Sequence, residues 1–145
     1  MKRKNLILIV ALIIGIAFAY TACSMMAKDM TVEDFKTEAT NNITQISPVD
    51  AKVLFDKGVV FVDVREQDEF QAGHIRGAQS IPRGTIEWMV PKKISKDKNA
   101  SIVLYCEHGS RGALATYTLV QMGYKNVKNL EGGRAAWKKA GFPLE

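Results

Sequence analysis

One cysteine stands between a buried strand and a helix, a position that suits a nucleophile. Cys106 directly follows the apolar run 101–105, and a helical segment is predicted to begin at Ser110. The N–H groups of a short loop that closes onto a helix N-terminus can turn toward one point, and Gly109 allows the positive φ that such a turn often needs. These amides and the helix dipole favour an anion, so we expect Cys106 to react as a thiolate.

The side chains of the same loop change the charge around the sulfur. Arg111 adds a positive charge, which together with the amides is expected to lower the thiol pKa from about 8.5. Glu107 would raise that pKa unless its carboxylate points to solvent, and a protonated His108 would offset the effect. His108 can equally be an exposed rim residue, and Arg111 can hold the loop through carbonyl or carboxylate contacts. Cys106 is the candidate catalytic residue; the candidate substrate-binding residues are Glu107, His108, Gly109, Ser110 and Arg111.

Short apolar runs alternate with segments of helical period from residue 43 onward. The runs at 59–64 and 101–105 are rich in β-branched side chains, as strands buried on both faces are. Weaker strands are predicted at 43–47, 78–81 and 126–130. Helices are predicted at 48–57, 67–72, 85–92, 110–122 and 133–140. This alternation predicts an α/β fold with a central parallel sheet covered by helices on both faces.

A second cation is expected at the edge of the sheet where the strands end. Arg65 follows the strand at 59–64, and in parallel sheets binding sites lie at the carboxyl ends of the strands. Arg65 should therefore lie at the same edge as Cys106, where it can attract an anionic donor. The alternative is a salt bridge to Glu66, Asp68 or Glu69.

The first 22 residues have the three parts of an export signal. Three basic residues at 2–4 precede an uninterrupted apolar run at 6–19, and Tyr20-Thr21-Ala22 leads to Cys23. The run is shorter than the ~20 apolar residues that span a bilayer comfortably. A small residue directly before a cysteine resembles the lipobox of bacterial lipoproteins, in which the cysteine becomes the lipidated first residue. Tyr20 departs from that pattern, because an aliphatic residue is usual there.

The chain therefore divides into three parts. We expect a lipoprotein-type signal peptide at 1–22, a polar tether at 23–44 and one folded domain at 45–145. An ordinary cleaved signal and an uncleaved anchor are the alternatives, and all three place the domain outside the cytoplasm. The expected location is periplasmic or extracellular, with the protein held to a membrane by lipid at Cys23 or released after cleavage.

The composition excludes several other classes of function. The net charge of +5 comes largely from the three basic residues at 2–4, so the rest of the chain is not basic enough to indicate nucleic-acid binding. Two cysteines and two histidines cannot form a disulfide framework or a four-cysteine zinc site, and we expect neither a metal nor an organic cofactor. If Cys23 is lipidated or removed, Cys106 is the free thiol that remains in the exported protein. We expect this protein to be a monomer.

Three groups of residues in 46–145 form a pattern typical of one family. The first group is Asp63-Val64-Arg65, Glu69-Phe70, Gly73-His74-Ile75, Gly77-Ala78 and Ile81-Pro82. The second is Cys106, Gly109 and Arg111, in the spacing C-x-x-G-x-R. The third is Glu131-Gly132-Gly133, Ala136-Trp137 and Gly141-Phe142-Pro143. In this order the groups resemble a single-domain rhodanese, a member of a sulfurtransferase family.

The resemblance implies a rhodanese-like three-layer fold and a persulfide enzyme. Cys106 would take the outer sulfur of a small sulfur-containing anion such as thiosulfate, hold it as Cys–S–SH and pass it to cyanide or a thiol. Asp63, His74 and Trp137 are then expected to be structural. Two positions depart from the family pattern. Glu107 stands where a basic or neutral residue is usual, which disfavours dianionic thiosulfate, and Gly112 stands where serine or alanine is common.

Two other functions use the same residue types. A cysteine phosphatase or arsenate reductase also places a cysteine and an arginine around an oxyanion, but with five residues between them, whereas Cys106 and Arg111 enclose four. A smaller ring should hold a sulfur atom better than a tetrahedral phosphate. A low-turnover sulfur-carrier or sensing module would use the same persulfide, so turnover distinguishes it from an enzyme.

Overall fold

The structure of the chain is a computed structural model that describes residues 29–145. The signal peptide expected at 1–22 and the lipidation expected at Cys23 lie outside the described residues. Residues Val32–Glu145 form one unit, which contains all the strands and helices described below. None of the helices in 29–145 is long and apolar enough to cross a bilayer.

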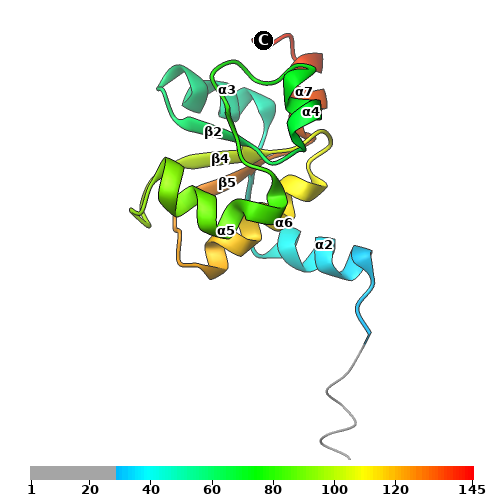
Figure 1. Ribbon diagram of the computed structural model, residues 1–145. Coiled ribbons are helices and arrows are strands. Elements are labelled where there is room, and N and C mark those ends of the chain that lie inside the picture. The colour runs from blue at the N-terminus through cyan, green and yellow to red at the C-terminus, as the bar shows by residue number, and fades with distance from the viewer. Residues whose placement is uncertain (1–28) are drawn as a thin grey trace, which may run out of the picture. The chain divides into compact units, whose positions relative to one another are not determined.

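A parallel sheet is the middle layer of this unit (Figure 1). In residues 29–145 the sheet has five strands in the order β1-β5-β4-β2-β3, and all neighbours are parallel. The strands are β1 (Thr44–Ile46), β2 (Val60–Asp63), β3 (Gln79–Ser80), β4 (Ile102–Tyr105) and β5 (Val127–Leu130). Each lies inside a predicted strand segment. The central strand β4 is buried along its whole length, as its continuous apolar sequence predicts.

Helices cover both faces of the sheet, which confirms the predicted three-layer α/β fold (Figure 1). On one face Val103 and Tyr105 of β4 pack in a cluster with Trp137 of α7 (Gly133–Lys139) and Ala51 of α3 (Pro48–Asp56). Ile102 and Leu104, which alternate with them, pack on the other face with residues of α5 (Ile86–Met89) and α6 (Ser110–Gln121). The shorter helix α4 (Gln67–Gln71) follows β2.

The prediction of one continuous helix at 85–92 is wrong. The segment instead contains a 3-10 turn at Arg83–Thr85, the short α5 and a π-helical turn at Val90–Ile94. Pro91 has no N–H to donate to the preceding turn, so regular α-helical bonding cannot continue through it. The chain closes with a wider turn, in which the N–H of Ser95 donates to the carbonyl of Val90 at 3.0 Å.

The segment expected to be a tether also contains a helix. Residues Val32–Asn41 form α2, which contacts α6, and Ala39 is fully buried there. The hydroxyl of Tyr117 on α6 also donates to Glu38 at 3.0 Å. The folded unit therefore begins before residue 45. The sequence lacked a signal for this contact, because α2 packs through one small side chain rather than through an apolar stripe.

The first turn of α6 lies unusually close to the sheet. A Cβ atom at Gly112 would collide with Oδ1 of Asn129 and would lie 3.2 Å from the Cα atom of Tyr105. Asn129 is 1% exposed, and its Oδ1 has no hydrogen-bond partner among the described residues. The departure from the family pattern at Gly112 therefore has a packing reason, because Asn129 fills the space that a larger residue would need.

We predict that Gly112→Ala destabilises the fold by about 1–3 kcal/mol, because overpacking outweighs the gain in helix propensity. Adding Asn129→Ala to Gly112→Ala should recover about 1 kcal/mol or more of the lost free energy of unfolding, since the new Cβ and the Asn129 side chain compete for the same space. Urea unfolding of the single and double variants measures both effects. Gly84→Ala is the control, because a Cβ there meets nothing within 4 Å. If Gly112→Ala and Gly84→Ala have the same free energy of unfolding, the proposed overpacking against Asn129 is wrong.

Candidate active site

Cys106 lies at the carboxyl end of β4, as the sequence predicts, and an amide points at its sulfur. The N–H of Gly109 donates to Sγ of Cys106 at 3.2 Å. Gly109 caps the N-terminus of α6 with φ +98°, so the predicted positive φ is confirmed. A residue with a Cβ would be strained in this conformation. The same backbone turn therefore starts α6 and directs an N–H to the thiol.

The sulfur is nearly enclosed by the loop and the sheet. Cys106 is only 2% exposed and belongs to the apolar cluster under α5 and α6. The two predicted substrate-binding residues that flank Gly109, His108 and Ser110, are exposed and form the outer rim of the loop. The thiol is therefore almost covered, while the residues on either side of Gly109 face solvent.

Arg111 pairs with a carboxylate that the sequence analysis placed in the family signature and not in the site. Its guanidinium donates to both oxygens of Glu69 in α4, at 2.6 and 2.7 Å. These hydrogen bonds lower the pKa of Glu69 to about 2. The hydrogen bonds to Glu69 are the main reason that the pKa of Arg111 is raised, and an interaction with Cys106 adds to the effect, so this cation lies near the sulfur while remaining paired. No spacing rule predicted this pair, because 42 residues separate its members.

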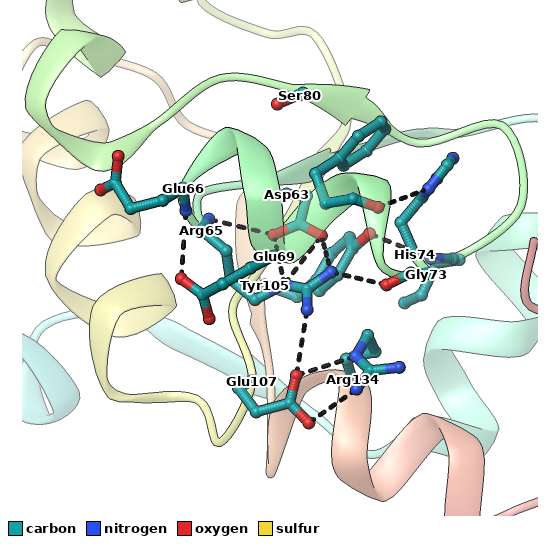
Figure 2. Close-up of polar contacts among 12 residues, drawn as sticks. Asp63, Arg65, Glu66, Glu69, Gly73, His74, Ser80, Tyr105, Glu107 and Arg134 are labelled. Carbon is teal, nitrogen blue, oxygen red and sulfur yellow. Dashed lines mark hydrogen bonds and ion pairs between the residues drawn. The ribbon is translucent and has the colours of Figure 1, made fainter.

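Both carboxylate oxygens of Glu107 are bound by arginines. Its carboxylate accepts two hydrogen bonds from Arg134 in α7, at 2.8 and 3.0 Å, and one from Arg65 at 3.1 Å (Figure 2). The bonds from Arg134 are the main reason that the pKa of Glu107 lies below its ordinary value. From the sequence, this side chain could point toward the sulfur or toward solvent, and in the structure it is instead bound by two arginines.

Arg65 is buried, and this corrects the role predicted for it. It is 2% exposed and pairs with Asp63, with Nη2 of Arg65 2.6 Å from Oδ2 of Asp63 (Figure 2). It also donates to the carbonyl of Gly73 at 2.9 Å and to Glu107. All three guanidinium nitrogens therefore have partners inside the domain, which favours the salt bridge over the attraction of a donor from solvent. The expected salt bridge exists, but with Asp63 and Glu107 rather than with a carboxylate of 66–69.

The remaining residues expected to be structural pack as predicted. Trp137 is fully buried and donates to the carbonyl of Pro143 at 3.0 Å. His74 stacks on Phe70 with 3.7 Å between ring centroids.

Tyr105, at the end of β4, also has a structural contact. Burial, followed by the charge of Asp63, raises the pKa of Tyr105, so its hydroxyl stays protonated and accepts from the N–H of Ile75 at 3.1 Å. Residues 29–145 contain no group of three or more His, Cys, Asp or Glu side chains that could hold a metal ion.

Comparison with known proteins agrees with this geometry. The sequence profile of the rhodanese-like domain matches residues 47–140. The chain belongs to the rhodanese-like domain family. This rhodanese domain is 34% identical over 101 residues to a thiosulfate sulfurtransferase, GlpE, of Pseudomonas fluorescens, a match that covers 70% of the chain and 89% of that protein. It is 31% identical over 112 residues to a tRNA uridine(34) hydroxylase of Escherichia fergusonii, with 75% of the chain but only 32% of that protein covered.

Solved structures with the same fold include one with a different proposed activity. A protein of unknown function from Rhodopseudomonas palustris, described as a possible tyrosine phosphatase, matches with a TM-score of 0.73 and 34% identity over 83% of this chain and 99% of that one. A rhodanese-like domain from Anabaena matches with a TM-score of 0.64 and 28% identity over 70% of this chain and 77% of that one.

We predict that Arg65→Met destabilises the domain by about 3–5 kcal/mol, because it leaves the buried carboxylate of Asp63 without its cation. Urea unfolding measures the loss. Lys52→Met is the matched control: it removes a partly exposed ion pair with Asp56 and should cost less than about 1 kcal/mol. Equal stability of the two variants would restore a solvent-facing role for Arg65.

Proposed function

We propose that this rhodanese domain is a sulfurtransferase that moves a sulfane sulfur through a persulfide on Cys106. The observation that carries the proposal is the N–H of Gly109, 3.2 Å from Sγ at the start of α6. A backbone amide and a helix N-terminus both stabilise a charged sulfur. The similarity to a thiosulfate sulfurtransferase supports the same reaction class.

In the first step, the thiolate of Cys106 attacks the outer sulfur of a donor such as thiosulfate. A bond forms between Sγ and that sulfur, and the bond between the outer sulfur and the sulfonate sulfur breaks. Its electron pair leaves with sulfite. Cys106 now carries a persulfide anion, whose terminal sulfur keeps the negative charge that it had in the donor, while the charge of the attacking thiolate leaves with sulfite.

In the second step, an acceptor such as cyanide or a thiolate attacks the terminal sulfur of the persulfide. The bond between that sulfur and Sγ breaks, and its electron pair returns to Cys106 as thiolate. Thiocyanate or an acceptor persulfide leaves. Neither step needs a metal or an organic cofactor, because the sulfur atoms supply the electrons and the protein supplies groups that stabilise charge.

Several features of the site favour transfer of a single atom. Cys106 is 2% exposed, so a terminal sulfur can approach more readily than a tetrahedral phosphate. Arg111 lies near the sulfur but shares its charge with Glu69, which makes the site less cationic than a free arginine would. The negative charge of Glu107 is directed to Arg65 and Arg134, so its expected repulsion of an anionic donor is weakened.

We predict that incubation with thiosulfate or a polysulfide adds the mass of one sulfur atom to the protein. Cys106→Ala should lose the adduct at residue 106, as located by peptide mapping, and should form no thiocyanate while keeping the fold, because alanine lacks the nucleophile. Intact-mass spectrometry and a colorimetric thiocyanate assay measure the two results. A stable adduct without turnover would indicate a sulfur-carrier or sensing module. Hydrolysis of an aryl phosphate without any sulfur adduct would indicate the phosphatase or arsenate reductase alternative.

We further propose that residues 1–22 direct export and that Cys23 becomes a lipidated N-terminus, which would anchor the protein to a membrane. The support is the arrangement of basic residues, apolar run and small residue before Cys23. Expressed with its full sequence in a bacterial host, the protein should appear in the membrane fraction with its N-terminus at Cys23 plus acyl chains. Cys23→Ser should lose the acyl mass. An intact N-terminus in the cytosol would contradict both export and lipidation.

A further inference from the structure

The loop that carries Cys106 is held on its outer side by α7. The N–H of Arg134 donates to the carbonyl of Cys106 at 2.8 Å, and the N–H of Ala135 donates to the carbonyl of Glu107 at 3.0 Å. These two donors belong to the first turn of α7. Consecutive carbonyls of the loop therefore both point toward one helix.

The direction of these carbonyls determines the direction of the following amides. No peptide bond in the described residues is cis. In a trans peptide the N–H lies opposite the carbonyl. The N–H groups of Glu107 and His108 must then point away from α7. The fixed peptide planes lead directly into the turn at Gly109, whose own N–H meets the sulfur.

The contact between the loop and α7 is close enough to require a glycine. A Cβ at Gly133 would collide with the carbonyl oxygen of Cys106 and would lie 2.7 Å from that of Glu107. Gly133 also has φ +60°, a left-handed conformation. The family signature at 131–133 thus has a mechanical reason here, since it lets the start of α7 touch the backbone of the reactive loop.

The side chain of Glu107 attaches the same loop a second time. It is bound through both oxygens by Arg134, whose backbone N–H already holds the carbonyl of Cys106. Its Oε2 also accepts from Arg65, which is fixed to Asp63 at the end of β2. Glu107 therefore links the loop to α7 and, through Arg65, to a neighbouring strand (Figure 2).

We propose that Glu107 is a positioning residue, which holds the loop between Arg134 and Arg65 so that the Gly109 amide stays on the sulfur of Cys106. It acts through Gly109 and does not contact the donor. The effect on turnover rests on the proposed sulfurtransferase function, whereas the effect on the Gly109 amide does not.

The test compares Glu107→Ala, Glu107→Gln and Arg134→Gln with the wild-type protein. The first readout is the ¹H–¹⁵N signal of the Gly109 amide and its hydrogen exchange. In Glu107→Ala the signal should move toward the position of a free amide, and exchange should speed up by about tenfold or more. Glu107→Gln, which keeps an oxygen that accepts from Arg134, should retain part of the wild-type behaviour. Asp56→Asn, which removes a surface ion pair of α3, is the matched control and should leave the signal in place.

The second readout is steady-state transfer of sulfur from thiosulfate to cyanide. Glu107→Ala should lower kcat about 10- to 100-fold, with KM for thiosulfate changed less than about threefold, because a misplaced amide affects the reacting state more than donor binding. Arg134→Gln should lower kcat by a similar factor. The double variant Glu107→Gln, Arg134→Gln should have a kcat no lower than that of the less active single variant. Arg134→Gln also decides the question if Glu107→Ala does not fold.

Three results overturn the proposal. An unchanged Gly109 signal in both Glu107→Ala and Arg134→Gln would show that the loop holds its shape without the carboxylate. A raised KM with unchanged kcat would make Glu107 a donor contact. Additive losses in the double variant would separate the two residues. If the wild-type protein transfers no sulfur, the proposed function fails, and the Gly109 signal still decides the positioning role.

Discussion

The contact between the N–H of Gly109 and the sulfur of Cys106 depends on one backbone constraint, the positive φ at residue 109. Only a residue without a Cβ adopts that angle at little cost, and the angle begins α6 at the place where β4 ends. Two further glycines permit the surrounding packing. Gly112 allows α6 to lie against Asn129, and Gly133 allows α7 to touch the loop carbonyls. The position of the sulfur thus depends on close approaches of α6 to the sheet and of α7 to the loop, which the side-chain contacts then support.

Charge around the loop is arranged in compensated pairs. Arg65 is paired with Asp63, Arg111 with Glu69 and Arg134 with Glu107. Each pair joins separate segments of the chain or closes the end of a strand, so the pairs hold the loop as well as cancel charge. The proposed sulfur transfer requires a charged sulfur, which the amide of Gly109 and the start of α6 would stabilise, with Arg111 as a cation shared with Glu69. Such a site suits a reaction in which one negative charge moves between neighbouring sulfur atoms.

The sequence predicted the features that depend on local rules. Apolar runs located all the strands of the sheet, and glycine at position 109 predicted the turn at the thiol. What it missed depends on contacts between distant segments. Arg65 and Glu107 are separated by 42 residues, and only the fold shows that they meet. The burial of Arg65 could not be inferred from residue type, because arginine is usually exposed. The packing of α2 against α6 was missed for a related reason, since the only buried residue of α2 is Ala39.

The decisive measurement is a high-resolution crystal structure of the protein after reaction with thiosulfate or a polysulfide. We expect a second sulfur atom bonded to Sγ of Cys106 and within hydrogen-bonding distance of N–H groups of residues 107–111, with Glu107 still bound to Arg134. An unmodified Cys106 under conditions in which the donor is consumed would contradict it. So would a terminal sulfur that turns away from the loop amides.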